Sequence, residues 1–542
     1  MLFNSLEFLV FLAIVYTLYR VLPFRLQNYM LLIASYIFYG WWDWRFLFLT
    51  AFSTTIDYWV GLTMQNRLGR REKILPAVFI TCAAVLFLGM HPGAVPAAIL
   101  GDPHPAIVKP ILPWVFFGIL SVLAIAGIWY RLVSHLPEHH RRKAALLTSV
   151  VCQLSLLGVF KYFNFFAETF VSGLHGLGVQ ADPVLINVIL PVGISFYTFQ
   201  SLSYAIDIYR RQFEPTDRFF DFALFVSYFP QMVAGPIERA RHLLPEFQKP
   251  RVLTLEQSAR GLYLIMLGLF KKVAIADGVA PSVNQVFGSS GVVTSADVIG
   301  GTLLFAVQIY CDFSGYTDIA RGVSKLLGID LMLNFNLPYF AKSPREFWRR
   351  WHISLSTWLS DYLYKTLGGN RGGLAFVCRN LMITMLLGGL WHGAAWNYVL
   401  WGFYHGSLLS VHRVWTSKRG GAPVVERPNV LLGAAKIGFF FLFTLYGWLL
   451  FRANSLQQVV DFTRLIFNGF GSLDIGFAIP RLSALAGIPL LAVMEFAEYN
   501  LNDRYWYRRL LLPLFGLQCA TLLFLTLMGT SNEPAQFIYF QF

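Results

Sequence analysis

The segment LLGGLWHGAAWNYVLWGFYHG, residues 386–406, contains no Asp, Glu, Lys or Arg. A helix needs about 20 predominantly apolar residues to cross a membrane, so this segment predicts a transmembrane helix. Similar uncharged stretches recur along the whole chain, at Leu26–Trp42, Ile74–Gly101, Pro110–Tyr130, Ala144–Phe160, Val184–Ile206, Leu381–Tyr404, Ile437–Phe451 and Leu510–Asn532. The apolar residues are therefore spread too evenly for a soluble body on a single membrane anchor.

The composition of the chain supports this prediction. Of its 542 residues, 56% are hydrophobic and 13% are charged, whereas soluble domains carry about 25% charged residues. The mean hydropathy is +0.55. These values exclude an ordinary soluble enzyme, a disordered chain and a small disulfide-stapled domain. We predict an all-α, multi-pass integral membrane protein with about 11 membrane segments, some of them re-entrant or interfacial.

The charged residues predict how the chain is oriented. There are 43 Lys and Arg against 29 Asp and Glu, a formal net charge of +14, and the basic residues form short clusters between apolar runs. Basic loops favour the cytoplasmic side, which places residues 67–73, 131–143, 413–419 and 508–509 inside. Counting spans then places the N-terminus and the tail 531–542 outside. This distribution does not resemble a nucleic-acid-binding face, and the five scattered cysteines show no metal-ligand spacing.

His392 is the clearest candidate for chemistry, because an ionisable group inside an apolar run is a functional candidate by default. Gly388, Gly389 and Gly393 flank it and would let a helix or a substrate approach the backbone. Histidine is well suited to moving a proton near neutral pH. Local sequence gives equal support to a structural histidine that is bonded to a helix carbonyl.

A second histidine lies in SPREFWRRWHISLSTWLSDYLY, residues 343–364. An aromatic and leucine stripe at steps of three and four, accompanied by arginines, predicts one interfacial amphipathic helix over this range. His352 would lie on that helix, with Trp348 and Ser356 one turn away on either side. It is a polar group among aromatic side chains, which favours more than a simple surface anchor.

A third cluster is YCDFSGYTDIARG, residues 310–322, which contains Asp312, Ser314, Tyr316 and Asp318. Its carboxylates could orient a histidine or bind a cation, or they could cap a helix where a span ends. The chain contains no GxSxG elbow and no phosphate-binding P-loop. An enzyme with these residues would therefore work by general base catalysis on two bound substrates.

Several long motifs together resemble the membrane-bound O-acyltransferase superfamily. FWRRWHISLSTWL (347–359) and LLGGLWHGAAW (386–396) resemble its two-histidine hallmark. Further motifs are similar to the bacterial branch of alginate O-acetyltransferase membrane subunits: SYIFYGWW (35–42), LPVGISFYTFQSLSY (190–204), AGPIER (234–239), YCDFSGYTDIA (310–320), NFNLPY (334–339) and LGGNRGG (367–373). The resemblance implies one multi-pass domain over residues 1–542, built around a central tunnel. Residues 76–143 depart from the pattern and predict inserted helices.

The resemblance also implies a function in the bacterial inner membrane. Such proteins take an acetyl group from cytoplasmic acetyl-CoA and pass it to a periplasmic SGNH-type or similar acetyltransferase, which modifies an exopolysaccharide such as alginate or cellulose. The polysaccharide synthesis and export machinery would be further partners. His392 matches the catalytic histidine and His352 the supporting one. Supporting or tunnel-lining roles would fall to Asp312, Ser314, Tyr316, Asp318, Trp391 and Asn397, with no metal ion.

The tail FIYFQF, residues 537–542, allows two interpretations. Aromatic residues at the boundary of a membrane are often interfacial anchors. Related acyl-transfer systems use a C-terminal aromatic tail with a tyrosine, so Tyr539 could instead accept the acyl group before the partner takes it. The free phenol has a pKa of about 10, so Tyr539 would need a base such as His392 nearby.

Two interpretations without acyl transfer compete with an enzyme. A transporter or flippase would move an acyl carrier or a sugar lipid without bond chemistry, and a scaffold would organise an export complex. The absence of an inverted repeat and the two histidines disfavour the transporter, and His392 disfavours the scaffold. The sequence does not identify the acceptor polymer.

Overall fold

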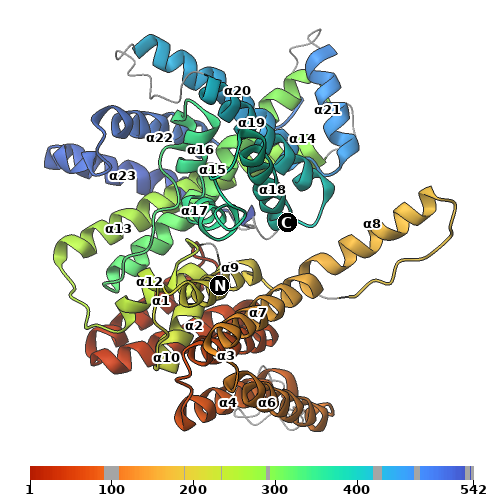
Figure 1. Ribbon diagram of the computed structural model, residues 1–542. Helices are drawn as coiled ribbons and strands as arrows, with labels where there is room; N and C mark the ends of the chain where they lie inside the picture. The colour runs from red at the N-terminus through yellow and green to blue at the C-terminus, as the bar shows by residue number, and fades with distance from the viewer. Residues whose placement is uncertain are drawn as a thin grey trace. The chain divides into compact units, whose positions relative to one another are not determined.

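The computed structural model describes residues 1–90, 109–187, 189–233, 235–288, 293–418, 430–468, 476–531 and 537–538. The residues in these ranges form helices and no β-strand (Figure 1). The all-α prediction is confirmed. The chain divides into two compact units, the first comprising Met1–Thr254 with Leu326–Leu331, the second Leu255–Lys325 with Met332–Phe542. Each unit is described by itself below.

Unit 1 consists of α-helices that are joined in places by short 3₁₀ or π-helical turns. The α-helices are α1 (Leu6–Val21), α2 (Phe24–Asp43), α3 (Leu47–Met64), α4 (Arg70–Ala84), α6 (Leu112–Ser134), α7 (Glu138–Leu157), α8 (Phe163–Gly176), α9 (Ile194–Tyr209), α10 (Phe219–Ser227), α11 (Phe229–Met232) and α12 (Ala240–Leu243). The turns are η1 (Trp44–Phe46), η2 (Val85–Gly89), η4 (Gly158–Tyr162) and η5 (Leu244–Phe247).

Unit 2 contains α15, a helix of 32 residues, and the segments that carry the predicted histidines. Its α-helices are α13 (Leu255–Leu269), α14 (Asp277–Gly288), α15 (Ser295–Leu326), α16 (Pro344–Arg350), α17 (Ile353–Trp358), α18 (Leu374–His392), α19 (Trp396–Lys418), α20 (Val430–Arg452), α21 (Leu456–Asn468), α22 (Leu482–Leu501) and α23 (Leu512–Gly529). Its turns are η6 (Phe270–Ala276), η7 (Pro338–Phe340), η8 (Leu359–Tyr364) and η9 (Trp506–Arg509).

Eight described helices are long and apolar enough to cross a membrane. They are Arg70–Gly89, Leu112–Ser134, Glu138–Gly176, Ser295–Leu326, Leu374–His392, Val430–Arg452, Leu482–Leu501 and Leu512–Gly529. Only 6% of the apolar window of α6, and 17% of that of α20 and of α23, is buried inside the protein. Apolar faces this exposed require an apolar solvent, so the chain is a multi-pass membrane protein. The further segments of the predicted eleven stay a prediction.

The interior of unit 1 contains a polar network where α3, α7 and α9 meet. Asp57 on α3 is fully buried, and its carboxylate accepts hydrogen bonds from the Ser149 hydroxyl at 2.5 Å and the Gln153 amide at 2.7 Å. The Gln153 amide also donates to the Ser53 hydroxyl, which lies 3.3 Å from the Ser201 hydroxyl. A buried carboxylate costs free energy unless its oxygens are hydrogen-bonded, and these partners hold the three helices together.

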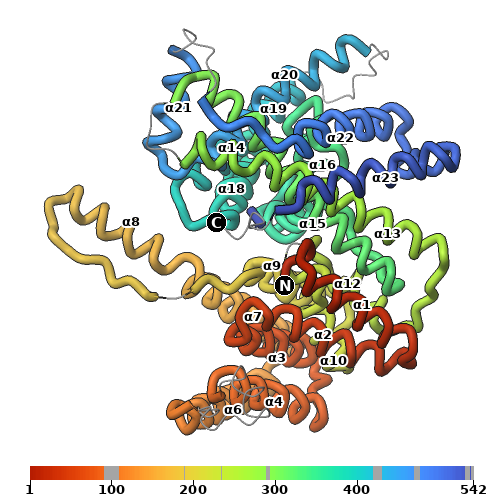
Figure 2. Tube along the Cα trace, turned by 180° about the vertical axis from the view of Figure 1, so that it is seen from behind, coloured from red at the N-terminus to blue at the C-terminus, as the bar shows by residue number. Residues whose placement is uncertain are grey.

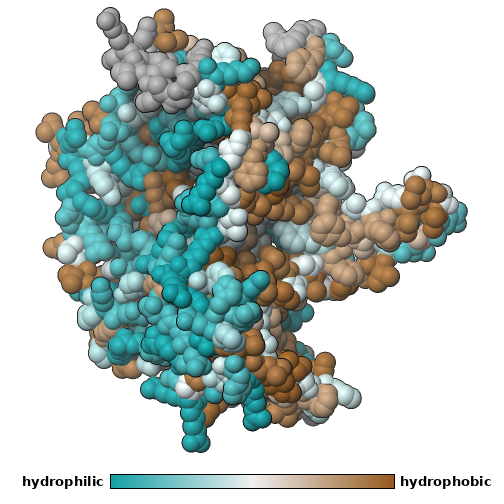
Figure 3. Space-filling model, in the orientation of Figure 1, coloured by the Kyte–Doolittle hydropathy of each residue, from teal (hydrophilic) through white to brown (hydrophobic). Residues whose placement is uncertain are grey.

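Two parts of unit 1 lie outside that interior. Within the predicted insertion, residues 76–143, helices α4 and α6 pack on each other through Ile80, Ala84 and Ile119. Helices α7 and α8 join through η4 into one continuous helix of 39 residues. In both views α8 extends away from the other helices of the unit (Figures 1 and 2). Its apolar side chains, among them Phe166 and Phe170, are exposed on its surface (Figure 3).

Residues 386–406 do not form the single helix that the sequence predicts, because α18 ends at His392 and α19 starts at Trp396. The hairpin of α18 and α19 depends on two glycines. A Cβ atom added to Gly389 would lie 2.2 Å from the Tyr398 carbonyl oxygen, and one added to Gly402 would lie 2.4 Å from the Met385 carbonyl oxygen. Real Cβ atoms do not approach that closely, so the two helix backbones are in direct contact. The prediction that glycines around His392 permit close helix approach is confirmed for Gly389.

We expect Gly402→Ala to destabilise the protein by about 1–3 kcal/mol, because overpacking forces backbone shifts. The matched control is Gly438→Ala on α20, where an added Cβ meets no atom within 4 Å; there Ala should be neutral or slightly stabilising. Thermal unfolding of both variants in the same detergent provides the comparison. Equal unfolding temperatures for the two variants would contradict the close packing of α18 on α19.

Candidate active site

His392 is the last residue of α18, and its position follows from the sequence around it. The helix ends because Gly393 is extended, with φ −158° and ψ 151°, and α19 starts three residues later at Trp396. The side chain is 4% exposed. Its ring centroid lies 5.0 Å from Trp401, 5.3 Å from Phe451 and 5.0 Å from Trp391. Aromatic rings therefore surround the imidazole and separate it from bulk solvent.

His352 lies where the predicted amphipathic helix is broken. The sequence predicts one helix over residues 343–364, but the structure divides it into α16, α17 and η8, so a continuous helix is wrong. His352 itself has φ 41° and ψ 56°, a left-handed conformation that a helix interior does not allow. The predicted stripe is buried in the protein, with Phe347, Trp351 and Leu355 each 1% exposed. Its aromatic side chains therefore serve the core of unit 2.

Asn334, in the NFNLPY motif, explains the break. Its carbonyl oxygen accepts a hydrogen bond from the Ile353 amide at 2.9 Å. Its side-chain oxygen accepts from both the amide and the hydroxyl of Ser354, at 3.2 Å and 2.9 Å. These bonds fix the first residues of α17 from a distant segment and leave His352 as the connecting residue. The NFNLPY motif is visible in the sequence, but no local pattern predicts that Asn334 bonds to Ile353 and Ser354.

The break brings the two histidines close together. The ring centroids of His352 and His392 are 6.4 Å apart, and Trp391 lies beside both, at 5.9 Å from His352. The ring of Phe313 contacts His352 edge to face at 4.7 Å. Burial lowers the pKa of His352 to about 3, so its imidazole is neutral at physiological pH. The site therefore holds two imidazoles in an aromatic enclosure, which suits proton transfer more than ion binding.

The carboxylate cluster of residues 310–322 separates into two faces of α15. Asp312 and Asp318 both lie inside this helix, so the alternative that they cap a helix end is wrong. Asp312 pairs with Lys272 at 2.8 Å and accepts a hydrogen bond from the Ile538 amide at 2.7 Å, and Tyr316, one turn on, packs on Phe537 at 4.3 Å. Ser314 and Asp318 lie on the other face and line a pocket.

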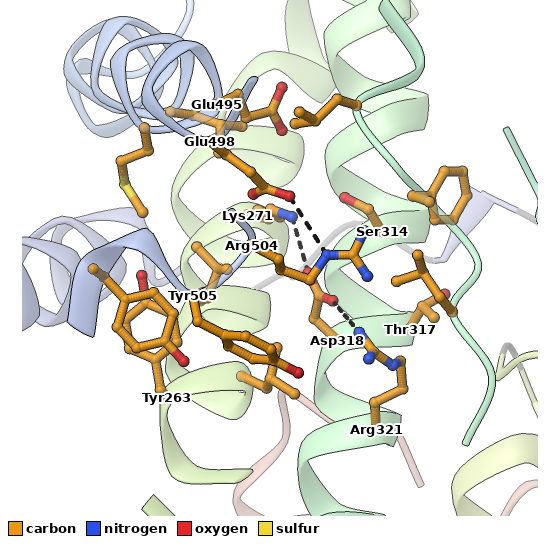
Figure 4. A pocket seen from close by; sticks show the side chains of 18 of the residues that line it. Tyr263, Lys271, Ser314, Thr317, Asp318, Arg321, Glu495, Glu498, Arg504 and Tyr505 are labelled. Atoms are coloured by element: carbon orange, nitrogen blue, oxygen red, sulfur yellow. Dashed lines mark hydrogen bonds and ion pairs between the residues drawn. The ribbon is translucent and has the colours of Figure 1, made fainter. Parts of the chain in front are cut away.

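That pocket is a cavity of about 80 Å³ between α13, η6, α15, α22 and residues 504–507 (Figure 4). Lys271 pairs with Asp318 at 2.9 Å, and Arg321 lies 3.7 Å from the same carboxylate. Arg504 pairs with Glu498 at 3.4 Å. Charges in an apolar protein are costly unless paired, which explains why they gather here. Sequence reasoning missed Lys271, Glu498 and Arg504, although charged residues inside apolar runs were the available signal.

The remaining predicted residues have different positions. Asn397 donates to the Ala453 carbonyl oxygen at 2.9 Å and so ties the start of α19 to the end of α20. Tyr539 lies outside the described residues. Within the described ranges, no group of three or more His, Cys, Asp or Glu side chains could hold a metal ion.

A third buried histidine, His405, was missed by sequence reasoning. It stacks on Phe347 at 6.0 Å and contacts Trp401 edge to face at 4.7 Å. Trp401 also contacts His392, so one indole separates these two imidazoles. The signal was present in the same uncharged segment, residues 386–406, in which His392 stands thirteen positions earlier.

The buried state of His352 predicts a pH dependence of stability. The pKa of His352 in the folded protein lies below its ordinary value of 6.5, so on acidification the unfolded chain binds a proton that the folded chain does not. The contribution of the neutral His352 side chain to the free energy of unfolding is therefore complete above pH 6.5, and it is lost as the pH falls toward 3. His352→Asn, a residue that tolerates the left-handed conformation, should reduce the loss of unfolding free energy between pH 7.5 and pH 5.0 by about 2 kcal/mol.

Denaturant unfolding in micelles at the two pH values measures this difference. His175→Asn is the control, because His175 is exposed on α8, and it should leave the pH dependence as in the original protein. A His352→Asn variant whose stability falls with pH as steeply as that of the unaltered chain would show that His352 is not held neutral.

Comparison with known proteins places this architecture among acyltransferases. The family model described as MBOAT, membrane-bound O-acyltransferase family, matches residues 114–456. The chain is 38% identical over 509 residues to a probable alginate O-acetylase AlgI of Azotobacter vinelandii, covering 93% of this chain and 86% of the relative. It is 38% identical over 511 residues to the Pseudomonas aeruginosa counterpart, covering 93% and 82%. A peptidoglycan O-acetyltransferase of Helicobacter pylori is 36% identical over 341 residues, covering 58% and 63%.

Proposed function

Because this chain belongs to the membrane-bound O-acyltransferase family, in the alginate O-acetylase-like branch, we propose that it carries an acetyl group from cytoplasmic acetyl-CoA to the outside of the cytoplasmic membrane. There the acetyl group would be used to O-acetylate a polysaccharide. Family membership makes the protein a membrane O-acyltransferase, which replaces the alternatives of a transporter or scaffold without bond chemistry. The donor, the acceptor and the direction of transfer are the parts proposed.

The paired histidines are the observation that carries the proposal. In this mechanism His392 acts as general base and removes the proton of an acceptor hydroxyl. The hydroxyl oxygen attacks the thioester carbonyl carbon, a C–O bond forms and the C–S bond breaks, and the proton passes from His392 to the CoA thiolate. The aromatic rings around His392 keep water out and so limit thioester hydrolysis. His352, neutral and 6.4 Å away between ring centroids, would orient the reacting groups.

The charged pocket of unit 2 supports a CoA donor. Its cations Lys271, Arg321 and Arg504 are the groups that would bind the phosphates of CoA, because charge-assisted hydrogen bonds to phosphate are strong. They would exchange their carboxylate partners Asp318 and Glu498 for phosphate. The pocket includes residues 504–507, next to the basic pair 508–509 that we predict to be cytoplasmic. Phe335 lines the pocket and contacts Phe313 at 5.0 Å, and Phe313 contacts His352. A donor in this pocket would therefore be separated from the histidines by aromatic rings alone.

The acceptor side is proposed from topology and from the relatives. The relatives are named for alginate and peptidoglycan O-acetylation, both of which concern polymers outside the cytoplasm. We infer an alginate- or cellulose-type exopolysaccharide for this chain, acetylated through a periplasmic SGNH-type or similar partner and the polysaccharide synthesis and export machinery. Both chain ends would lie outside the inner membrane, as the basic loops predict.

Tyr539 is proposed as an acyl relay between these two sides. Its described neighbours support this role: Phe537 is fully buried and Ile538 is 2% exposed. The alternative of an interfacial anchor does not fit these two residues, because they pack inside the protein. Phe537 contacts Phe313 at 6.0 Å, and Phe313 contacts His352. Phe313 thus lies between the described end of the chain and His352.

Substituting His392 tests the proposed chemistry. His392→Ala should reduce the release of free CoA from acetyl-CoA by about 10²–10⁴-fold, the usual contribution of a general base, in purified protein supplied with an acceptor in liposomes. His175→Ala, at an exposed site on α8, should retain full activity. If His392→Ala releases CoA at the normal rate, His392 is not the base.

The relay is tested at the tail. Tyr539→Phe removes the phenol oxygen and keeps the ring, so polysaccharide acetylation should be abolished while the protein stays in the membrane. Mass spectrometry of the C-terminal peptide of the unaltered chain should detect an added acetyl group that is absent in the His392→Ala variant. Full acetylation of the polymer by the Tyr539→Phe variant would eliminate the relay.

A further inference from the structure

A buried group of charges lies in unit 2 on the face of α15 opposite the pocket. The ammonium of Lys272, 1% exposed, lies 2.8 Å from the carboxylate of Asp277 and 2.8 Å from that of Asp312. Lys272 belongs to η6, Asp277 begins α14 and Asp312 lies in α15. Removing such charges from water is expensive, and only close pairing repays it. The three groups thus fix the relative positions of three helical segments.

One of these carboxylates also binds the far end of the chain. The second oxygen of Asp312 accepts a hydrogen bond from the backbone amide of Ile538 at 2.7 Å, across 226 residues of sequence. A hydrogen bond to an ionised acceptor is roughly twice as strong as one between neutral groups. Lys272 pairs with the first oxygen of Asp312 and so holds this carboxylate in the position in which it accepts the bond. The charge of Lys272 therefore acts on the tail through Asp312.

The side chains next to this bond complete a socket for the tail, which we define as Asp312, Phe313 and Tyr316. The Phe537 ring is fully buried, with its centroid 4.3 Å from that of Tyr316 and 6.0 Å from that of Phe313. Ile538 is 2% exposed. The carboxylate thus fixes a main-chain group of the tail, and the neighbouring rings fix an aromatic side chain of it.

The start of the tail is fixed on the same π-helical turn. At the end of α23, a Cβ added to Gly529 would lie 2.7 Å from both the Val273 carbonyl oxygen and the Ala274 Cα. The chain therefore leaves α23 in direct contact with η6. Lys272 in η6 then holds Asp312, which holds Ile538. π-Helical turns occur often at functional sites. Here η6 contacts Gly529, where the C-terminal segment begins, and positions Ile538 through Lys272 and Asp312.

We propose that the socket is a binding site for the chain's own C-terminal segment, and that Lys272, Asp277 and Asp312 are positioning residues that hold Ile538 in it. The socket lies beside His352, because Phe313 contacts both Phe537 and His352. Binding of the tail is independent of the acyl-transfer chemistry. Its consequence for acetyl transfer rests on the proposed function.

Hydrogen exchange of the Ile538 amide tests the socket directly. The full-length protein is reconstituted in nanodiscs, and exchange is read at single-residue resolution by mass spectrometry with electron-transfer fragmentation. Asp312→Asn keeps the side-chain size and removes the charge, and Lys272→Met removes the cation. Each should speed exchange at Ile538 by about ten-fold or more, because each weakens a charge-assisted hydrogen bond. Exchange in α18 should stay slow, which shows that the variants are folded.

The chain supplies a matched control in the adjacent lysine. Lys271 pairs with Asp318 on the other face of α15, so Lys271→Met should leave Ile538 exchange unchanged. Phe537→Ala, a change in the tail itself that does not touch the charged core, should speed exchange as Asp312→Asn does. Unchanged Ile538 exchange in a folded Asp312→Asn variant, or an equal effect of Lys271→Met, would overturn the socket.

Acetyl transfer by the same variants separates this inference from the proposed function. If both hold, Asp312→Asn lowers kcat about ten-fold or more and leaves the KM for acetyl-CoA unchanged, because the donor pocket lies on the other face of α15. If exchange responds as expected but the unaltered protein transfers no acetyl group, the socket stands and the proposed function fails. If exchange responds but kcat stays normal in Asp312→Asn, the socket binds the tail without positioning it for transfer, and the positioning role is wrong.

Discussion

The interior of unit 2 is organised by the cost of keeping a charge away from water. Inside an apolar protein, an unpaired ammonium or carboxylate is too costly to retain. The buried lysines of η6 therefore have carboxylate partners, Lys271 on Asp318 and Lys272 on Asp312 and Asp277. Adjacent residues of a helical turn point in different directions, and the two neighbouring lysines pair with carboxylates on opposite faces of α15. One helix thus separates a charged pocket from the socket of the tail.

The two histidines lie among aromatic side chains. Trp391, Trp401 and Phe451 surround His392, and Phe313 lies against His352. A neutral imidazole can accept a proton, whereas one that is already charged cannot. The ion pairs therefore fix the positions of the helical segments, and the aromatic rings surround the histidines that we propose to react. Phe313 belongs to both arrangements, since it contacts His352 and Phe537.

Sequence reasoning reached the helical fold, the membrane location, the family and the two histidines, because each depends on composition, on apolar run length or on a local motif. It failed where the conformation or the contacts of a residue depend on a partner far away in the sequence. The left-handed turn at His352 depends on Asn334, and the role of Asp312 depends on Ile538. No sequence pattern distinguishes Lys271 from Lys272, yet they pair with carboxylates on different faces of α15. A one-dimensional pattern records periodicity and cannot show which of two adjacent charges finds which carboxylate.

The continuous helix of α7 and α8 has a mechanical consequence. Its 39 residues correspond to about 58 Å at 1.5 Å per residue, whereas the hydrocarbon layer is about 30 Å thick. Tilts of membrane helices stay below about 40°, so no ordinary tilt hides the whole rod in the lipid. A stiff stalk must stand clear of the bilayer. Because exposed apolar side chains such as Phe166 and Phe170 favour lipid, the part that we expect outside the hydrocarbon layer is the charged start of α7, from Glu138 to Lys143.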